Sequence, residues 1–259
     1  MSKVLGNYDA PALLALLQEY GVGRVLRSRG FLGPDLAIDD RTGALINLRL
    51  YGWKSGVRYL LLEAALREGS SDLTPIDAQT TELADLLVVQ WVKEQDPTAH
   101  FTAEHPRLPL QEHPGLGVLR RVFRVALRIG RDLGKDGVAS YPKYPHDAAI
   151  FYRSRLFLFA DPSEQGRFVA MLRDLGDLSL RDISLAVIGG CVRREDGRGV
   201  TTLSWHPGLQ VFPLSRRLAD YFNSVEYARR VEEAAQARHW VDPAALAGTR
   251  RAFEVSASI

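Results

Sequence analysis

The stretch Leu116–Gly134, LGVLRRVFRVALRIGRDLG, decides how this sequence is interpreted. Wound as an α-helix at about 100° per residue, it divides into two faces. The apolar face contains Val118, Leu119, Val122, Val125, Ala126, Ile129 and Leu133. The opposite face, which we call the basic stripe, contains Arg120, Arg121, Arg124, Arg128, Arg131 and Lys135. We therefore predict a helix over 116–134 that packs against a core on one side and exposes cations on the other.

The segments that follow this helix alternate between short strands and helices. A Pro-rich loop at 141–145 leads into the run 148–152, which reads as a strand, and the run 183–192 fits either a buried strand or a short helix. A hairpin turns at 195–199. The remaining expected elements are strands at 156–160 and 210–212 and helices at 161–175, 216–222, 225–238 and 243–252. This rhythm predicts an α+β or mixed α/β fold, helix-rich, with two β-hairpins and a small sheet in the C-terminal half.

The residues before the basic stripe are interpreted as mostly helical. A helix is expected at 9–20, and a hairpin joins 36–38 to the alternating strand 44–50. Apolar residues at helical spacing predict two further helices, at 54–67 and 74–95. The connection 96–115 is rich in Pro and His, so we expect it to be irregular. It suggests an N-terminal helical lobe over 1–100 and a C-terminal α/β lobe over 115–259, although one continuous domain fits as well.

Composition is that of an ordinary globular protein. The chain has 259 residues, a formal net charge of +2 and 46% hydrophobic residues, so it is not basic throughout. Arginine far outnumbers lysine, which codon usage in a GC-rich, bacterial-type genome explains more simply than function does. A single cysteine, no signal-peptide pattern and no apolar run long enough to span a membrane lead us to expect a soluble protein of the cytoplasm.

The basic stripe has two competing explanations. Like charges four residues apart repel one another, so the stripe weakens an isolated helix and needs something to offset it. Acidic side chains from a neighbouring element, such as Glu232 or Glu233, could neutralise it within the fold. Alternatively, the stripe contacts an anionic partner, either an acidic protein surface or nucleic acid. Association with a membrane surface is a third and less favoured reading.

Polar side chains also gather directly after this helix. Tyr141, Lys143 and His146 precede an expected strand, and loops that enter strands often carry sites. His146 and its neighbour Asp147 place an imidazole beside a carboxylate. Adjacent residues on a strand point to opposite faces, so a structural role for His146 is favoured over a catalytic dyad. Tyr141, Lys143 and His146 are therefore only weak catalytic candidates.

The other reactive residue types give little support for chemistry. Cys191 follows two glycines, as some nucleophiles do, but a buried, quiet thiol is the better explanation. The histidines are too scattered to predict a metal site. We find no phosphate-loop, dinucleotide-binding or hydrolase-elbow fingerprint, so no cofactor is expected.

Two functions from different classes remain. The first is a non-catalytic binding or adaptor protein of a cytoplasmic assembly, which contacts an anionic partner through the basic stripe. The second is a hydrolase or transferase acting on an anionic, phosphate-bearing substrate, with Tyr141, Lys143 and His146 near the chemistry. The sequence leaves open whether the protein is an enzyme, and it does not predict an oligomeric state. Convergence of these side chains in one pocket would favour the enzyme.

Overall fold

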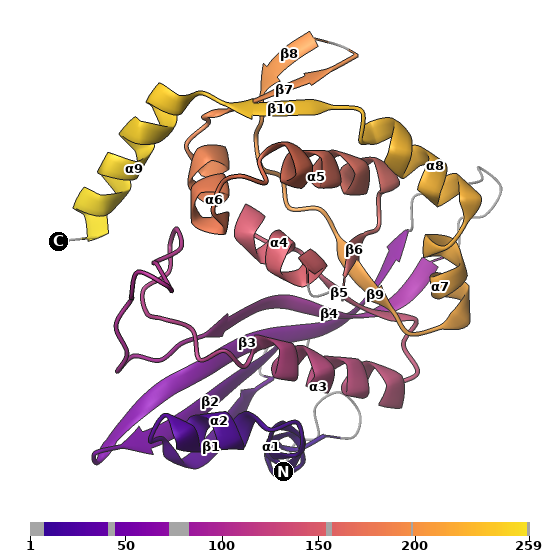
Figure 1. Cartoon of the computed structure of the whole chain (residues 1–259). Coiled ribbons are helices and arrows are strands. Elements are labelled where there is room, and N and C mark those ends of the chain that lie inside the picture. The colour runs from indigo at the N-terminus through magenta and orange to yellow at the C-terminus, as the bar shows by residue number, and fades with distance from the viewer. Residues whose placement is uncertain (1–7, 41–44, 73–82, 154–156, 198, 258–259) are drawn as a thin grey trace.

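The computed structural model describes residues 8–40, 45–72, 83–153, 157–197 and 199–257, which form two sheets and their covering helices (Figure 1). The N-terminal part contains α1 (Ala10–Glu19), α2 (Val22–Ser28), β1 (Leu32–Asp39), β2 (Ile46–Lys54), β3 (Val57–Asp72) and β4 (Leu83–Glu94). The middle part contains α3 (Leu119–Asp132), β5 (Gly137–Ser140), α4 (Pro145–Arg153), β6 (Leu158–Phe159) and α5 (Pro162–Asp174). The remainder contains α6 (Leu180–Ile188), β7 (Val192–Asp196), β8 (Gly199–Thr202), β9 (Gln210–Pro213), α7 (Arg216–Phe222), α8 (Val225–Ala234), β10 (Arg238–Val241) and α9 (Pro243–Ala257).

The larger sheet has the strand order β1-β2-β3-β4-β5-β9-β6. All neighbouring strands are antiparallel except β4 and β5, which run parallel. The smaller sheet, β10-β7-β8, is antiparallel and belongs to the C-terminal half. The mixed α/β class, the two hairpins β1–β2 and β7–β8 and the small C-terminal sheet are thus confirmed. Because β4 pairs with β5, the large sheet crosses the lobe boundary that the sequence suggested.

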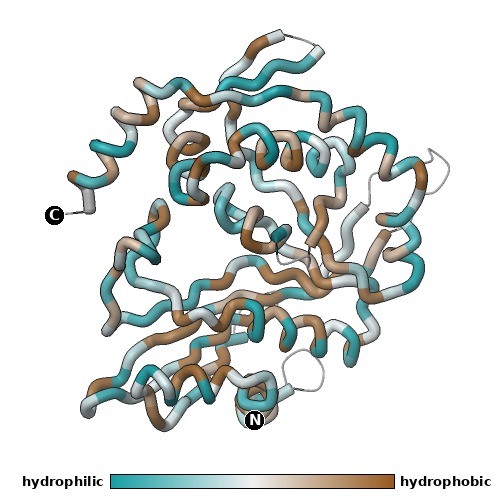
Figure 2. Tube along the Cα trace, in the orientation of Figure 1, coloured by the Kyte–Doolittle hydropathy of each residue, from teal (hydrophilic) through white to brown (hydrophobic). Residues whose placement is uncertain are grey.

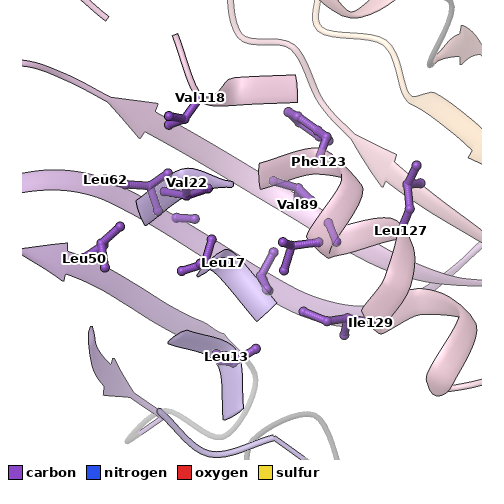
Figure 3. Close-up of a cluster of buried hydrophobic side chains, with 14 of the residues drawn as sticks. Leu13, Leu17, Val22, Leu50, Leu62, Val89, Val118, Phe123, Leu127 and Ile129 are labelled. Carbon is purple, nitrogen blue, oxygen red and sulfur yellow. The ribbon is translucent and has the colours of Figure 1, made fainter. Parts of the chain in front are cut away.

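The main core lies between the large sheet and helices α1, α2 and α3 (Figure 3). Leu13 and Leu17 of α1 meet Ile129 of α3 over Leu62 and Val89 of the sheet. In Figure 2 these helices and strands are banded brown and teal, because each has both an apolar and a polar face. Burial of this apolar surface, at about 25 cal/mol per Å², is the main force that holds the helices on the sheet.

The opposite face of β4, β5 and β9 is also covered. Leu86 and Val88 of β4 point into a second cluster with Leu218 of α7 and Tyr227 of α8, whereas their neighbours Leu87 and Val89 point toward α3. The strand is therefore apolar on both faces. That explains why the prediction of a helix over 74–95 was wrong. In a segment buried on every side, polar and apolar residues do not alternate, so the sequence has no periodicity that distinguishes a strand from a helix. Residues 73–82 of that prediction lie outside the described residues.

The predicted helix at 54–67 is also wrong, because these residues lie in β3. A bulge interrupts its pairing with β2, where Leu50 faces Leu62 and Tyr51 faces Leu60, so Leu61 has no partner in β2. Leu61 and Leu62 are both buried as a result. Bulges break the alternation of a strand and leave apolar residues at spacings that imitate a helix.

Three smaller predictions need correction. The run 148–152 belongs to helix α4 rather than to a strand. The run 183–192, left open between strand and helix, is mostly helix α6, and β7 begins at its end. The helix expected to end at 238 ends at Ala234, and strand β10 follows it. The irregular connection at 96–115 is confirmed, and its base is closed by the Asp96 amide, which donates to the Pro114 carbonyl at 2.7 Å.

Within the part of the chain that the structure describes, no helix combines the length and the apolar character needed to cross a membrane.

Candidate functional site

The beginning of α3 presents a group of backbone donors. Val118 occupies the N-cap position, where its side chain makes no capping hydrogen bond. The amides of Gly117 and Val118 instead donate to the carboxylate of Glu94 at the end of β4, at 3.1 and 2.7 Å. Gly115 permits this approach, because a Cβ there would lie 2.9 Å from Glu94 Oε1. The two residues that directly precede the first turn of α3 thus bind an anionic group through their amides.

Glu94 is held in a setting that disfavours its charge. Burial raises the pKa of Glu94, and the two amide hydrogen bonds only partly offset that rise. The first turn of α3 contains no acidic residue, and Arg120 and Arg121 lie where the helix dipole is already positive. The cation that acts on Glu94 is Arg29 of the segment after α2, whose charge lowers the pKa of this carboxyl.

Strand β4 extends beyond its pairing with β5. The last paired residues are Val89 and Ser140, and β5 ends there, whereas β4 continues for five residues to Glu94. Opposite this extension β3 remains paired with β4, and a bulge at Gln90 interrupts the register. At about 3.4 Å per residue, the amides of α3 lie about 17 Å along β4 from the end of β5. Among the described strands none pairs with this edge of β4 beyond Val89, and the edge joins the amides of Gly117 and Val118 to the carboxyl end of β5.

The connection between β5 and α4 carries the other predicted residues. Tyr141 is half-buried directly after β5 and packs beside the cluster that covers the sheet, whereas Lys143 is exposed, with its ammonium 5.4 Å from the ring of Tyr144. Both lie at the carboxyl end of the parallel pair, where ligands of open α/β sheets commonly bind. The structure thus places Tyr141 and Lys143 at the same sheet edge as the extension of β4.

His146 does not join them. It is buried in α4, and its Nδ1 lies 2.7 Å from Ser184 Oγ in α6. Burial lowers the pKa of His146 to about 4 and raises that of Asp147 to about 6, although a backbone hydrogen bond and Lys143 act against the second shift. The His146 Nε2–Asp147 Oδ1 distance is 3.6 Å. The ring links two packed helices, and its partner is a serine hydroxyl rather than a catalytic group in an open site.

The basic stripe is largely open to solvent. Arg120, Arg124, Arg128 and Arg131 are exposed on α3, and Val125 and Ile129 are buried on its opposite side. Val122 and Leu133 are half-buried against the same core. Arg128 forms an ion pair with Asp132 at 2.8 Å. Because the arginines are exposed and the apolar residues lie on the core side, the predicted helical register of α3 is confirmed. Among the described residues Arg124, near the middle of the stripe, makes no hydrogen bond or ion pair.

Two members of the predicted stripe lie elsewhere. Lys135 is buried and paired with Glu68 and Asp85, because α3 ends before it and the chain turns back toward the sheet. Arg121 is half-buried, and its Nη1 donates to the Gly117 carbonyl at 3.3 Å. These two cations do not share the solvent-exposed face of Arg124.

The acid that pairs with the basic stripe is not one of the two that the sequence suggested, Glu232 and Glu233. Glu233 lies on α8, where it pairs with Arg229. The acid that contacts the stripe is Asp132, on α3 itself.

The structure gives no support to the remaining candidates, a nucleophilic cysteine and a metal site built from histidines, among the described residues. Cys191 is buried, and its Sγ lies 3.3 Å from Thr249 Oγ1. Among the described residues, no group of three or more His, Cys, Asp or Glu side chains is placed to hold a metal ion. Sequence reasoning missed Glu94, Gly115 and Gly117. The available signal was a Gly-x-Gly pair immediately before the basic helix, where backbone can approach an anion closely.

Comparison with known proteins adds little. No family model matches the chain, and no curated protein matches it. Among solved structures, the chain is similar to the crystal structure of a Tyr-to-Phe mutant of KacT, with 15% identity and a TM-score of 0.31 over 60% of this chain and 80% of that one. A likeness this low carries no argument about function.

Proposed function

We propose that the chain is a transferase that binds an extended, phosphate-bearing group donor along the unpaired edge of β4. The observation that carries this proposal is the extension of β4 beyond β5 in the only parallel pair of the described sheets, with anion-binding amides before α3 at the far end of that extension. Phosphate groups bind well at such helix starts because backbone amides and the helix dipole act together. A phosphate would compete with Glu94 for the amides of Gly117 and Val118.

The length of the β4 extension favours a long group donor over a compact one. A compact donor that binds at the amides of Gly117 and Val118 would keep its reactive group about 17 Å along β4 from the end of β5, after which Tyr141 and Lys143 follow. A donor with phosphates at one end and a long arm at the other reaches both places, and thioesters of coenzyme A are group carriers of this form. The arm would lie beside Gln90–Glu94, where the strand edge can hydrogen-bond an extended chain. Tyr141 and Lys143 would then lie near the transferred group.

Two glycines that flank α3 provide a matched test. Gly117 precedes the helix and Gly134 follows it; their φ angles are 75° and 67°, and a Cβ at either would contact nothing within 4 Å. Alanine at each therefore introduces a similar strain of about 1–2 kcal/mol. We expect Gly117→Ala to weaken binding of acetyl-coenzyme A at least tenfold in calorimetry and Gly134→Ala to leave it unchanged.

Other probes test the shape of the donor. Acetyl-coenzyme A should bind more tightly than ATP or inorganic pyrophosphate, which lack the arm. Absence of binding by all three molecules, or equal weakening by the two glycine variants, would refute the proposal. Tighter binding of ATP would overturn the extended donor specifically.

A second function is supported by the open cations of the basic stripe. We infer that α3 contacts an anionic macromolecule, because Arg124 is exposed and makes no ion pair among the described residues. The Arg124→Glu variant should weaken binding to a nucleic-acid duplex and flatten its salt dependence by about one unit of slope if a phosphate is contacted. If the partner is an acidic protein, the variant should mainly slow association. A loss of thermal stability without a change in binding would contradict both.

A further inference from the structure

A large groove lies away from the candidate donor site, between α5, α8 and the small sheet. Its volume is about 1140 Å³, and its walls include Glu164 and Arg167 of α5, Arg194 of β7 and His239 of β10. Figure 1 shows α5 beneath β10, with α8 following the same side of the molecule. The groove is large enough for a small organic molecule or a short peptide.

An aromatic wall lines part of this groove. The ring of Phe168 lies 5.2 Å from that of Phe159 and 6.1 Å from that of Trp205. Trp205 is fixed by its Nε1, which donates to the Pro142 carbonyl at 3.2 Å. This bond ties the groove to the β5–α4 connection. An apolar group with a flat face could pack against such a wall.

Most charges in the groove already have partners. Arg229 pairs with Glu226 and Glu233, and Arg230 pairs with Glu226. Glu164 and Arg167 are different, because neither makes a hydrogen bond or ion pair with any described residue. Burial, with help from Asp161, raises the pKa of Glu164, and the nearby charges of Arg167 and His206 act against that rise. A carboxyl and a guanidinium, three residues apart on α5, thus line the groove close enough to interact electrostatically but without forming a direct ion pair.

A buried histidine and a half-buried arginine complete the polar part. His239 and Arg194 are directly opposite in the β10–β7 pairing. The His239 side chain is fully buried, its Nδ1 lies 3.4 Å from Asp174 Oδ2, and neither ring nitrogen has a hydrogen-bond partner among the described residues. Arg194 Nε is likewise buried without a hydrogen bond, although it lies 3.3 Å from Asp196 Oδ2. Buried polar atoms without partners are uncommon and call for an explanation.

We propose that this groove binds a zwitterionic ligand with a large apolar side chain, of the chemical class of an aromatic α-amino acid, free or at the end of a short peptide. The ligand carboxylate accepts from Arg167 and Arg194, and its ammonium donates to Glu164. The side chain packs on Phe168 and Trp205.

This assignment accounts for the unmatched groups with one ligand. A simple anion would leave the carboxyl of Glu164 beside it unpaired, and a simple cation would do the same to Arg167. Unpaired charges in a partly buried site are costly, so a ligand with both charges fits the groove best. The inference is independent of the proposed transferase activity, since its residues differ from those at the start of α3.

Three small molecules test each charge separately. L-phenylalanine has both charges, 3-phenylpropionate lacks the ammonium, and L-phenylalaninamide lacks the carboxylate. We expect saturable binding of L-phenylalanine, seen as a change in Trp205 fluorescence that is lost in Trp205→Phe, and at least tenfold weaker binding of the other two. L-phenylalanyl-L-phenylalanine, measured in parallel, shows whether the free amino acid or the peptide binds more tightly.

Matched variants locate the ligand. Glu164→Gln should abolish the preference for L-phenylalanine over 3-phenylpropionate, and Arg167→Met should abolish the preference over the amide. Arg229→Met removes a groove cation that is already paired and should leave both preferences intact. Far-UV circular dichroism checks that each variant is folded.

Two results would overturn the proposal. One is the absence of saturable binding by L-phenylalanine and by the dipeptide. The other is binding of 3-phenylpropionate or the amide as tight as that of L-phenylalanine, which would show that one charge alone is recognised.

Discussion

His146 and His239 are both buried and both have a lowered pKa because of burial, yet their surroundings differ. His146 shares a hydrogen bond with Ser184 between two packed helices. His239 lines a groove, and its ring has no hydrogen-bond partner among the described residues. The first ring is satisfied by a hydrogen bond within the fold, whereas the second is fully buried with only the Asp174 carboxylate 3.4 Å from its Nδ1. Burial alone therefore does not show whether a histidine is satisfied within the fold.

Replacing each histidine with leucine should give the largest contrast. His146→Leu leaves the buried hydroxyl of Ser184 without a partner, so we expect a loss of about 2–3 kcal/mol in the free energy of unfolding. His239→Leu removes only the longer contact with Asp174, at 3.4 Å, and should change stability by less than about 1 kcal/mol. Urea denaturation of both variants measures the difference. Equal losses would remove the distinction between the two histidines.

A double variant sharpens the same comparison. Adding Ser184→Ala to His146→Leu replaces both partners with apolar groups, which should recover part of the stability lost in the single variant. We expect a recovery of about 1 kcal/mol in urea denaturation. Additive losses would show that the Ser184 hydrogen bond contributes nothing.

The pH dependence of stability should also separate the groups around His146. Its pKa falls from 6.5 to about 4 on folding, so the unfolded chain binds more protons in that interval and stability rises with pH between 4 and 6.5. The pKa of Asp147 rises from 3.8 to about 6, so its contribution is lost as pH rises through that range. The two effects oppose one another in the native protein. Asp147→Asn removes the opposing effect, so only that of His146 remains. We therefore expect the melting temperature of this variant to fall more steeply with decreasing pH than that of the native protein.

The smallest effect is expected on α3, where the contrast between partnered and unpartnered groups recurs at the surface. Arg128 is paired with Asp132, whereas Arg124 makes no ion pair among the described residues. Neither Arg124→Gln nor Arg128→Gln should shift the melting temperature strongly, because exposed ion pairs contribute little. We expect a small decrease for Arg128→Gln and none for Arg124→Gln. A larger decrease for Arg124→Gln would mean that a neighbouring acid holds it.

Sequence patterns correctly predicted those helices and strands that have one buried face and one face exposed to solvent. The register of α3 follows from its exposed arginines, and the hairpin from β1 to β2 follows from alternation and turn residues. Strands β3 and β4 escaped detection for two reasons. A bulge at Leu61 breaks the alternation of β3, and burial on both faces removes it from β4.

The candidate sites were predicted less well than the fold. Tyr141 and Lys143 lie at the carboxyl end of the parallel strands β4 and β5. They lie at the same end of the sheet as Glu94 only because these two strands, which are distant in sequence, pair with each other. Likewise, His239 faces Arg194 only because β10 returns to β7. Residues brought together by sheet pairing leave no local pattern, so the sequence alone offers no means of associating them.

The pairing of β5 also determines when the large sheet can be finished during synthesis. Strand β5 lies between β4 and β9, and β9 is made more than 60 residues after β5. Helices α1 and α2 and strands β1 to β4 contact one another over short sequence distances and can assemble early. On a translating ribosome, the free side of β5 must then wait until residues 210–213 emerge. We expect the nascent chain to be most prone to mispairing and to chaperone binding in that interval.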